Sequence, residues 1–80
     1  MGDESFNNNL SDQLRYDLDL LIEEKRIVNK RIMMSKETLN EIPSTHPKYS
    51  ILKDNIDIDQ IESDELQFKI EAIEERIKSL

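Results

Sequence analysis

The sequence predicts an all-α fold, an antiparallel two-helix coiled-coil hairpin that associates into a four-helix bundle or packs on a partner. Three observations support this fold class. First, the 80 residues include one glycine, two prolines and no tryptophan, and 36% of them are charged, which is typical of long helices. Second, apolar residues recur at alternating steps of three and four along most of the chain. Third, both prolines lie in one short segment near the middle, which divides the pattern into two stretches of similar length.

The first helix is predicted over residues 11–42. The preceding residues 1–10, MGDESFNNNL, are polar and lack periodicity, so we expect a disordered tail there. Ser11 supplies a hydroxyl that can cap free backbone amides, and Asp12 places an acid near the positive end of the helix dipole. Lys25 and Ser35 interrupt the apolar stripe of this helix. The apolar members of the stripe are Leu14, Leu18, Leu21, Val28, Ile32, Leu39 and Ile42.

A turn over residues 43–47 and a second helix over residues 47–80 follow. The segment PSTHP combines two prolines with two hydroxyl residues, which favours a turn and a new helix start. Asp59 and Ser63 interrupt the apolar stripe of the second helix. Its apolar members are Tyr49, Leu52, Ile56, Leu66, Ile70, Ile73, Ile77 and Leu80. A short connection between helices of similar length makes them antiparallel neighbours. We call the facing stripes of the two helices the seam.

The register of the two helices can also be predicted. If the turn is centred between residues 45 and 46, residues whose numbers add to 91 face each other, so Leu21 meets Ile70 and Leu14 meets Ile77. The charges beside the seam agree, because four of five facing pairs have opposite signs and only Lys36 with Lys53 is alike. The four opposite pairs are Asp17 with Arg76, Glu24 with Lys69, Arg31 with Glu62, and Arg15 with Glu74.

An acidic segment, DNIDIDQIESDE at residues 54–65, lies beside the basic residues of positions 26–37 in this register. Internal charge complementarity that sets the register is the leading interpretation. Docking of a basic partner is an alternative, because Asp54, Asp57 and Asp64 point outward. A metal site is disfavoured, since the segment lacks the glycine and the alternating acids of a calcium loop.

A second set of large apolar residues lies outside the seam. With the heptad lettered a to g and the seam at a and d, these residues occupy positions c and f. On a helical wheel, positions c and f lie next to g rather than e, and g faces g across the hairpin, so we expect one apolar lateral face. Its residues are the predicted partner-binding site: Tyr16, Leu20, Ile27, Met34, Ile51, Ile58, Ile61 and Phe68. The opposite side is predicted to be polar apart from Ile22 and Met33.

No catalytic, cofactor-binding or metal-binding residues are predicted, and we do not expect an enzyme. The chain has no cysteine and a single histidine, His46, which we assign to the turn. A net charge of −7 disfavours nucleic acid and anionic membranes as partners. No apolar run is long enough for a membrane span, and no signal peptide is present. We therefore expect an intracellular, cytoplasmic protein.

The leading functional prediction is a protein–protein interaction module that binds a protein partner or a second copy of itself as a homodimer. In length and hairpin plan, residues 11–80 resemble the Rho-effector finger domains, and the resemblance implies binding to a Ras-like small GTPase. That family has a Gly-Ala element late in its first helix, where this chain has Ser35-Lys36-Glu37-Thr38, so no residue is assigned from it. A small stand-alone protein inhibitor is a further alternative.

Overall fold

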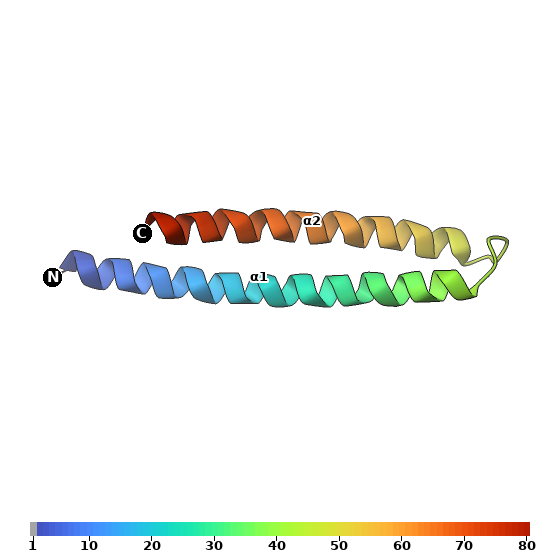
Figure 1. Cartoon of the computed structure of the whole chain (residues 1–80), viewed down its shortest axis with the longest axis horizontal. Helices are drawn as coiled ribbons and strands as arrows, with labels where there is room; N and C mark the ends of the chain where they lie inside the picture. Colours follow the sequence, from blue (N-terminus) through green and yellow to red (C-terminus); the bar gives the residue numbers. More distant parts are fainter. Residues whose placement is uncertain (1) are drawn as a thin grey trace.

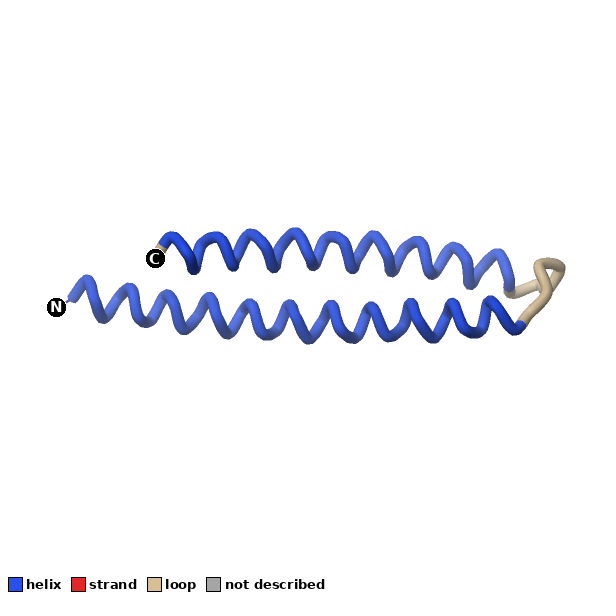
Figure 2. Tube along the Cα trace, in the orientation of Figure 1, coloured by secondary structure: helices blue, strands red, loops and turns tan. Residues whose placement is uncertain are grey.

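The computed structural model shows a hairpin of two long antiparallel helices (Figure 1). It describes residues 2–80, with side chains from residue 9 onward. Helix α1 spans Gly2–Glu41 and helix α2 spans Tyr49–Ser79. The two termini lie at one end of a rod of 66 × 14 × 13 Å, and the loop that joins the helices lies at the other end (Figure 2). The all-α hairpin predicted from the sequence is confirmed.

Helix α1 begins earlier than the sequence predicted. It starts at Gly2, whereas we expected a disordered tail over residues 1–10 and a helix start at Ser11. Residues 2–10 contain no proline, and once a helix exists each added residue gains one backbone hydrogen bond, so the polar segment can continue the helix. This extension projects past the end of α2 (Figure 1), so no facing helix packs against it.

The connection is held by a compact set of hydrogen bonds around His46. The backbone amide of His46 donates to the carbonyl of Pro43 (2.9 Å), and the amide of Tyr49 donates to the carbonyl of His46 (3.0 Å). The His46 side chain also accepts, at Nδ1, a hydrogen bond from the amide of Lys48 (3.0 Å). A histidine in this position therefore closes the turn and helps to start α2. This agrees with its assignment to the turn.

The seam forms as predicted. Every predicted seam position except Leu80, the C-cap of α2, is buried or half-buried. The best-buried part is the middle, where Val28 and Ile32 of α1 pack with Ile56 and Leu66 of α2. The phase of the heptad pattern was therefore assigned correctly on both helices.

Three of the four polar residues in the seam, Lys25, Asp59 and Ser63, have a partner on the facing helix. Ser63, which is 3% exposed, donates a hydrogen bond from Oγ to Oδ1 of Asn29 (2.7 Å). Lys25 donates from Nζ to the side-chain carbonyl of Gln67. No buried side-chain nitrogen or oxygen among the described residues lacks a hydrogen-bond partner. The cost of placing polar groups in this seam is thus offset by hydrogen bonds rather than left uncompensated.

Charge pairs across the seam are fewer than the register allows. Arg31 reaches the predicted Glu62 at 3.2 Å and also the seam residue Asp59 at 3.2 Å. The predicted pairs Asp17–Arg76, Glu24–Lys69 and Arg15–Glu74 are not within ion-pair distance in the described part of the chain. All of these residues except Asp17 are exposed, and holding two exposed charged side chains together costs side-chain entropy for little Coulomb energy.

Candidate protein-docking surfaces

All eight residues predicted to bind a partner are exposed. Their exposed fractions range from 47% at Leu20 to 74% at Phe68, which is unusual for large apolar side chains in a folded chain. The eight are Tyr16, Leu20, Ile27, Met34, Ile51, Ile58, Ile61 and Phe68. The hairpin seam therefore covers none of them.

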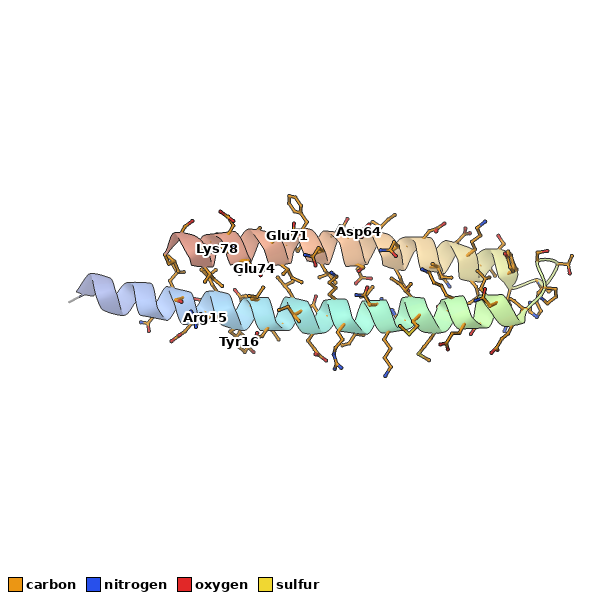
Figure 3. The ribbon with its side chains drawn as sticks, in the orientation of Figure 1. Arg15, Tyr16, Asp64, Glu71, Glu74 and Lys78 are labelled. Atoms are coloured by element: carbon orange, nitrogen blue, oxygen red, sulfur yellow. The ribbon has the colours of Figure 1, made fainter. Side chains whose placement is uncertain are left out.

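Three of these residues, Tyr16, Ile61 and Phe68, occupy position f and point directly away from the seam. The other five occupy position c, between the back of their helix and its g side. Tyr16 lies on the edge of α1 that is turned away from α2 (Figure 3). Asp64 and Glu71 lie on the half of α2 that is turned away from α1, whereas Glu74 lies on the side toward α1 (Figure 3). The expectation of a single lateral face is therefore wrong for the three residues at position f, and it stays a prediction for the five at position c.

Helix geometry explains the correction. A step of two residues turns an α-helix by about 200°, so a residue two positions from each of two seam neighbours points directly away from the seam. Tyr16 lies two positions from both Leu14 and Leu18, and Phe68 lies two positions from both Leu66 and Ile70. Position f was grouped with the g side of the hairpin, but it faces directly backward on each helix.

We call Tyr16, Leu20, Ile27 and Met34 the outer stripe of α1. Charged residues interrupt it at nearly every turn. Glu23 lies between Leu20 and Ile27 and pairs with Arg26, whose Nη2 is 2.7 Å from the Glu23 carboxylate. The hydrogen bond from Arg26, followed by its positive charge, lowers the pKa of Glu23, and the same hydrogen bond raises the pKa of Arg26. Both signs of charge thus occur on this stripe.

We call Ile51, Ile58, Ile61 and Phe68 the outer stripe of α2. This stripe contains a shallow open depression between Ile61 and Phe68, which are seven residues apart. The depression is lined by these two residues together with Asp64, Glu65 and Lys69. Ile51, Ile58 and Ile61 are 60%, 61% and 59% exposed, so the whole stripe stands free of the hairpin.

A row of carboxylates borders the outer stripe of α2. Asp57, Asp64 and Glu71 recur every seventh residue and alternate with Ile61 and Phe68 at steps of four and three, which makes them surface neighbours. None of the three takes part in an ion pair with any side chain that the structure describes. The row lies on the side of the hairpin that the sequence predicts to be polar. It borders Ile61 and Phe68 because positions b and f are neighbours on a helix.

Two neutral glutamine side chains donate hydrogen bonds to carboxylates of this row. Gln60 donates to the Asp64 carboxylate (3.2 Å), and Gln67 donates to the Glu71 carboxylate (3.1 Å), each from one turn earlier on α2. These bonds orient the carboxylates without cancelling their charge. The row therefore keeps its negative potential along the back of the helix.

Other exposed apolar residues lie off both stripes. Ile22 is 48% exposed and Met33 is 62% exposed, on the side that the sequence predicted to be otherwise polar. Among the described residues, no three His, Cys, Asp or Glu side chains are placed to hold a metal ion. Neither α1 nor α2, over the stretch described, is both long and apolar enough to cross a bilayer.

Comparisons with models of known protein families, with curated proteins and with solved structures find no match to this chain. Function is therefore argued from the surfaces themselves.

Proposed function

We propose that this chain is a non-enzymatic protein–protein interaction module, an antiparallel coiled-coil hairpin that binds helices through its outer stripes. The observation that carries this proposal is the exposure of all eight stripe residues while the seam residues between the helices are buried or half-buried. Large apolar patches that stay in water are rare on soluble monomers and mark interaction surfaces. The apolar residues that the seam does not use are thus available to a partner.

The residues at position f, Tyr16, Ile61 and Phe68, favour docking along the edges of the hairpin. A four-helix bundle would instead pack a second hairpin over one broad side of the seam. On the side that carries the g positions, this would cover Arg31 and Glu62, which are 54% and 50% exposed in their side chains. Burying such a pair carries a desolvation cost that its mutual attraction need not repay. Helices added at the back of α1 or α2 avoid this cost.

Substitution of one residue from each stripe tests the proposal. Ile27→Asp alters the outer stripe of α1 and Ile58→Asp that of α2, and neither touches the seam. We expect the unaltered chain to associate, with itself or with an added amphipathic helical peptide, in sedimentation velocity from low to high micromolar concentration. At least one of the two variants should lose this association while keeping the helical circular dichroism spectrum.

Ser44→Asp is the matched control, because Ser44 is exposed, polar and lies in the turn, outside both helices. It adds the same charge without removing an apolar group, so association should persist. A chain that stays monomeric at every concentration and binds no helical peptide would contradict the proposal. So would variants that associate as strongly as the unaltered chain.

A further inference from the structure

We propose that the outer stripe of α2 binds a basic amphipathic helix of another protein. This inference rests on the proposed function and adds to it the face that binds and the chemistry of the partner. It follows from two features that coincide on one surface of α2, an apolar ridge with a depression and an uncompensated row of acids.

The apolar half of the site matches the contact surface of a helix. The apolar residues of this surface keep the spacing of a helix contact stripe. The steps are three from Ile58 to Ile61, seven from Ile61 to Phe68, and four from Phe68 to Ala72. From Ile51 to Phe68 the stripe is about 25 Å long at 1.5 Å per residue, which a partner helix of about five turns would cover. An apolar side chain of that helix can enter the depression between Ile61 and Phe68.

The charged half of the site selects the partner. Asp57, Asp64 and Glu71 run beside Ile61 and Phe68 of the stripe. Glu65 lies at the depression together with Lys69, the one cation among the lining residues. All four carboxylates are exposed, and no ion pair neutralises them in the part of the chain that the structure describes. A partner helix with Lys or Arg at every seventh position would place one cation beside each acid of the row. The complement of this surface is therefore basic and apolar.

A second copy of α2 does not supply that complement. In an antiparallel pair, like rows face each other, so the row of Asp57, Asp64 and Glu71 would lie beside the same acids of the copy. In a parallel pair, each residue at the interface faces the same residue of the copy, so Glu65 would face Glu65. Acid therefore meets acid in either direction, and such like-charge contacts are destabilising.

The outer stripe of α1 is a poorer site for the same helix. Its central charged residues are the paired Glu23 and Arg26, together with Lys30, so it presents no single sign of charge. A basic helix would gain less there and would meet Lys30 between Ile27 and Met34. This difference provides an internal control within the same chain.

The test is a fluorescence-anisotropy titration with two synthetic peptides. Each is about 21 residues long, with Leu and Ile at heptad spacing. One carries Lys and Arg beside the apolar stripe, and the other carries Glu at the same positions. Lys, Arg and Glu have similar helix propensity, so the pair differs in charge rather than in helicity. We expect the basic peptide to bind and the acidic peptide to bind much more weakly, with a preference that declines as salt is added.

Variants then locate the binding site. Phe68→Ala should weaken binding of the basic peptide by at least about tenfold, as expected for an aromatic side chain at the centre of an interface. Tyr16→Ala removes another exposed aromatic residue, from α1, and should change affinity by less than about twofold. The combined variant Asp57→Asn, Asp64→Asn, Glu71→Gln should weaken binding by about fivefold to tenfold at low salt and flatten its salt dependence. None of these side chains lies in the seam, so the variants should stay folded, and circular dichroism checks this.

Three results would overturn the inference. The first is equal binding of the two peptides, and the second is a loss on Tyr16→Ala as large as that on Phe68→Ala. The third is a self-association of the chain that requires Phe68, which would make a second copy the occupant. If the chain associates through Ile27 while Phe68→Ala has no effect, this inference fails and the proposed function stands. If it neither associates nor binds either peptide, both fail.

Discussion

Replacing the acid in the middle of the seam should make the hairpin more stable. Asp59 occupies a seam position on α2, and its side chain is only 17% exposed. In Asp59→Leu, an apolar side chain would take the place of a carboxylate that packs between the two helices. Fully burying a leucine side chain gains about 1.5–3 kcal/mol, and the site removes roughly four-fifths of the side chain from water, so the expected gain is about 1–2.5 kcal/mol.

The ion pair that this substitution removes contributes less free energy than the apolar burial gains. Asp59 gives up its ion pair with Arg31, whose side chain is 54% exposed, and such pairs are worth about 0.2–1 kcal/mol. Arg31 is not left alone, because Glu62 accepts a hydrogen bond from the same nitrogen at 3.2 Å. The net stabilisation should be about 0.5–2 kcal/mol, which corresponds to a rise in Tm of several degrees for a chain of this size.

Urea unfolding followed by circular dichroism measures this change, at several protein concentrations so that association is separated from folding. Glu62→Leu is the matched control. It removes the other carboxylate beside Arg31, but the Glu62 side chain is 50% exposed, so little apolar burial is gained and the midpoint should hardly move. An unfolding midpoint for Asp59→Leu at or below that of the unaltered chain would refute the reasoning. It would mean that the Arg31–Asp59 contact contributes more than apolar burial at this position.

Three further predictions concern the seam, the N-terminal extension and the effect of pH. Leu66→Ala, in the best-packed part of the seam where Leu66 is 5% exposed, should lower the free energy of unfolding by about 2–3 kcal/mol in the same urea assay, and a loss below about 1 kcal/mol would contradict the packing. Removing residues 2–9 should leave the urea midpoint nearly unchanged, because this part of α1 extends past the end of α2, and a clear drop would show that the extension packs on something. The pKa of Glu23 is lowered by its hydrogen bond from Arg26, so this contact stabilises the folded chain above the ordinary carboxylate pKa and ceases to do so as the pH falls through the lower, folded value. The midpoint of Glu23→Gln should therefore lie below that of the unaltered chain at pH 7 and coincide with it in strong acid, whereas a gap that widens on acidification would refute the assignment.

Much of the hairpin was predictable because heptad spacing is a local property of the chain. Leu14, Val28, Ile56 and Ile70 could be assigned to the seam since steps of three and four keep residues on one side of any α-helix. The antiparallel register followed from the length of the turn. The partners of the polar seam residues were also within reach, since Ser63 and Asn29 are nearly level in that register.

The candidate site was predicted in part. Exposure of Phe68 and Ile61 followed from their absence from the seam, and the structure bears it out. The prediction that they share one face with Tyr16 is wrong, because position f points directly away from the seam on each helix. The depression beside Phe68 depends on side-chain conformations along α2, which no pattern of residue types specifies.

The amino-acid pattern alone thus determined two helices, the side by which they meet and the level at which their residues face. These are consequences of helical periodicity and of one proline-rich turn. The tertiary structure decided which groups made contact and where the surplus apolar surface points. Arg31 meets both Asp59 and Glu62, while the predicted pair Glu24–Lys69 does not form in the described part of the chain, because weak exposed ion pairs depend on side-chain conformation rather than on sequence position. Tyr16 and Phe68 point in opposite directions for a geometric reason. Both occupy position f, and antiparallel helices that share a seam turn their f positions away from each other.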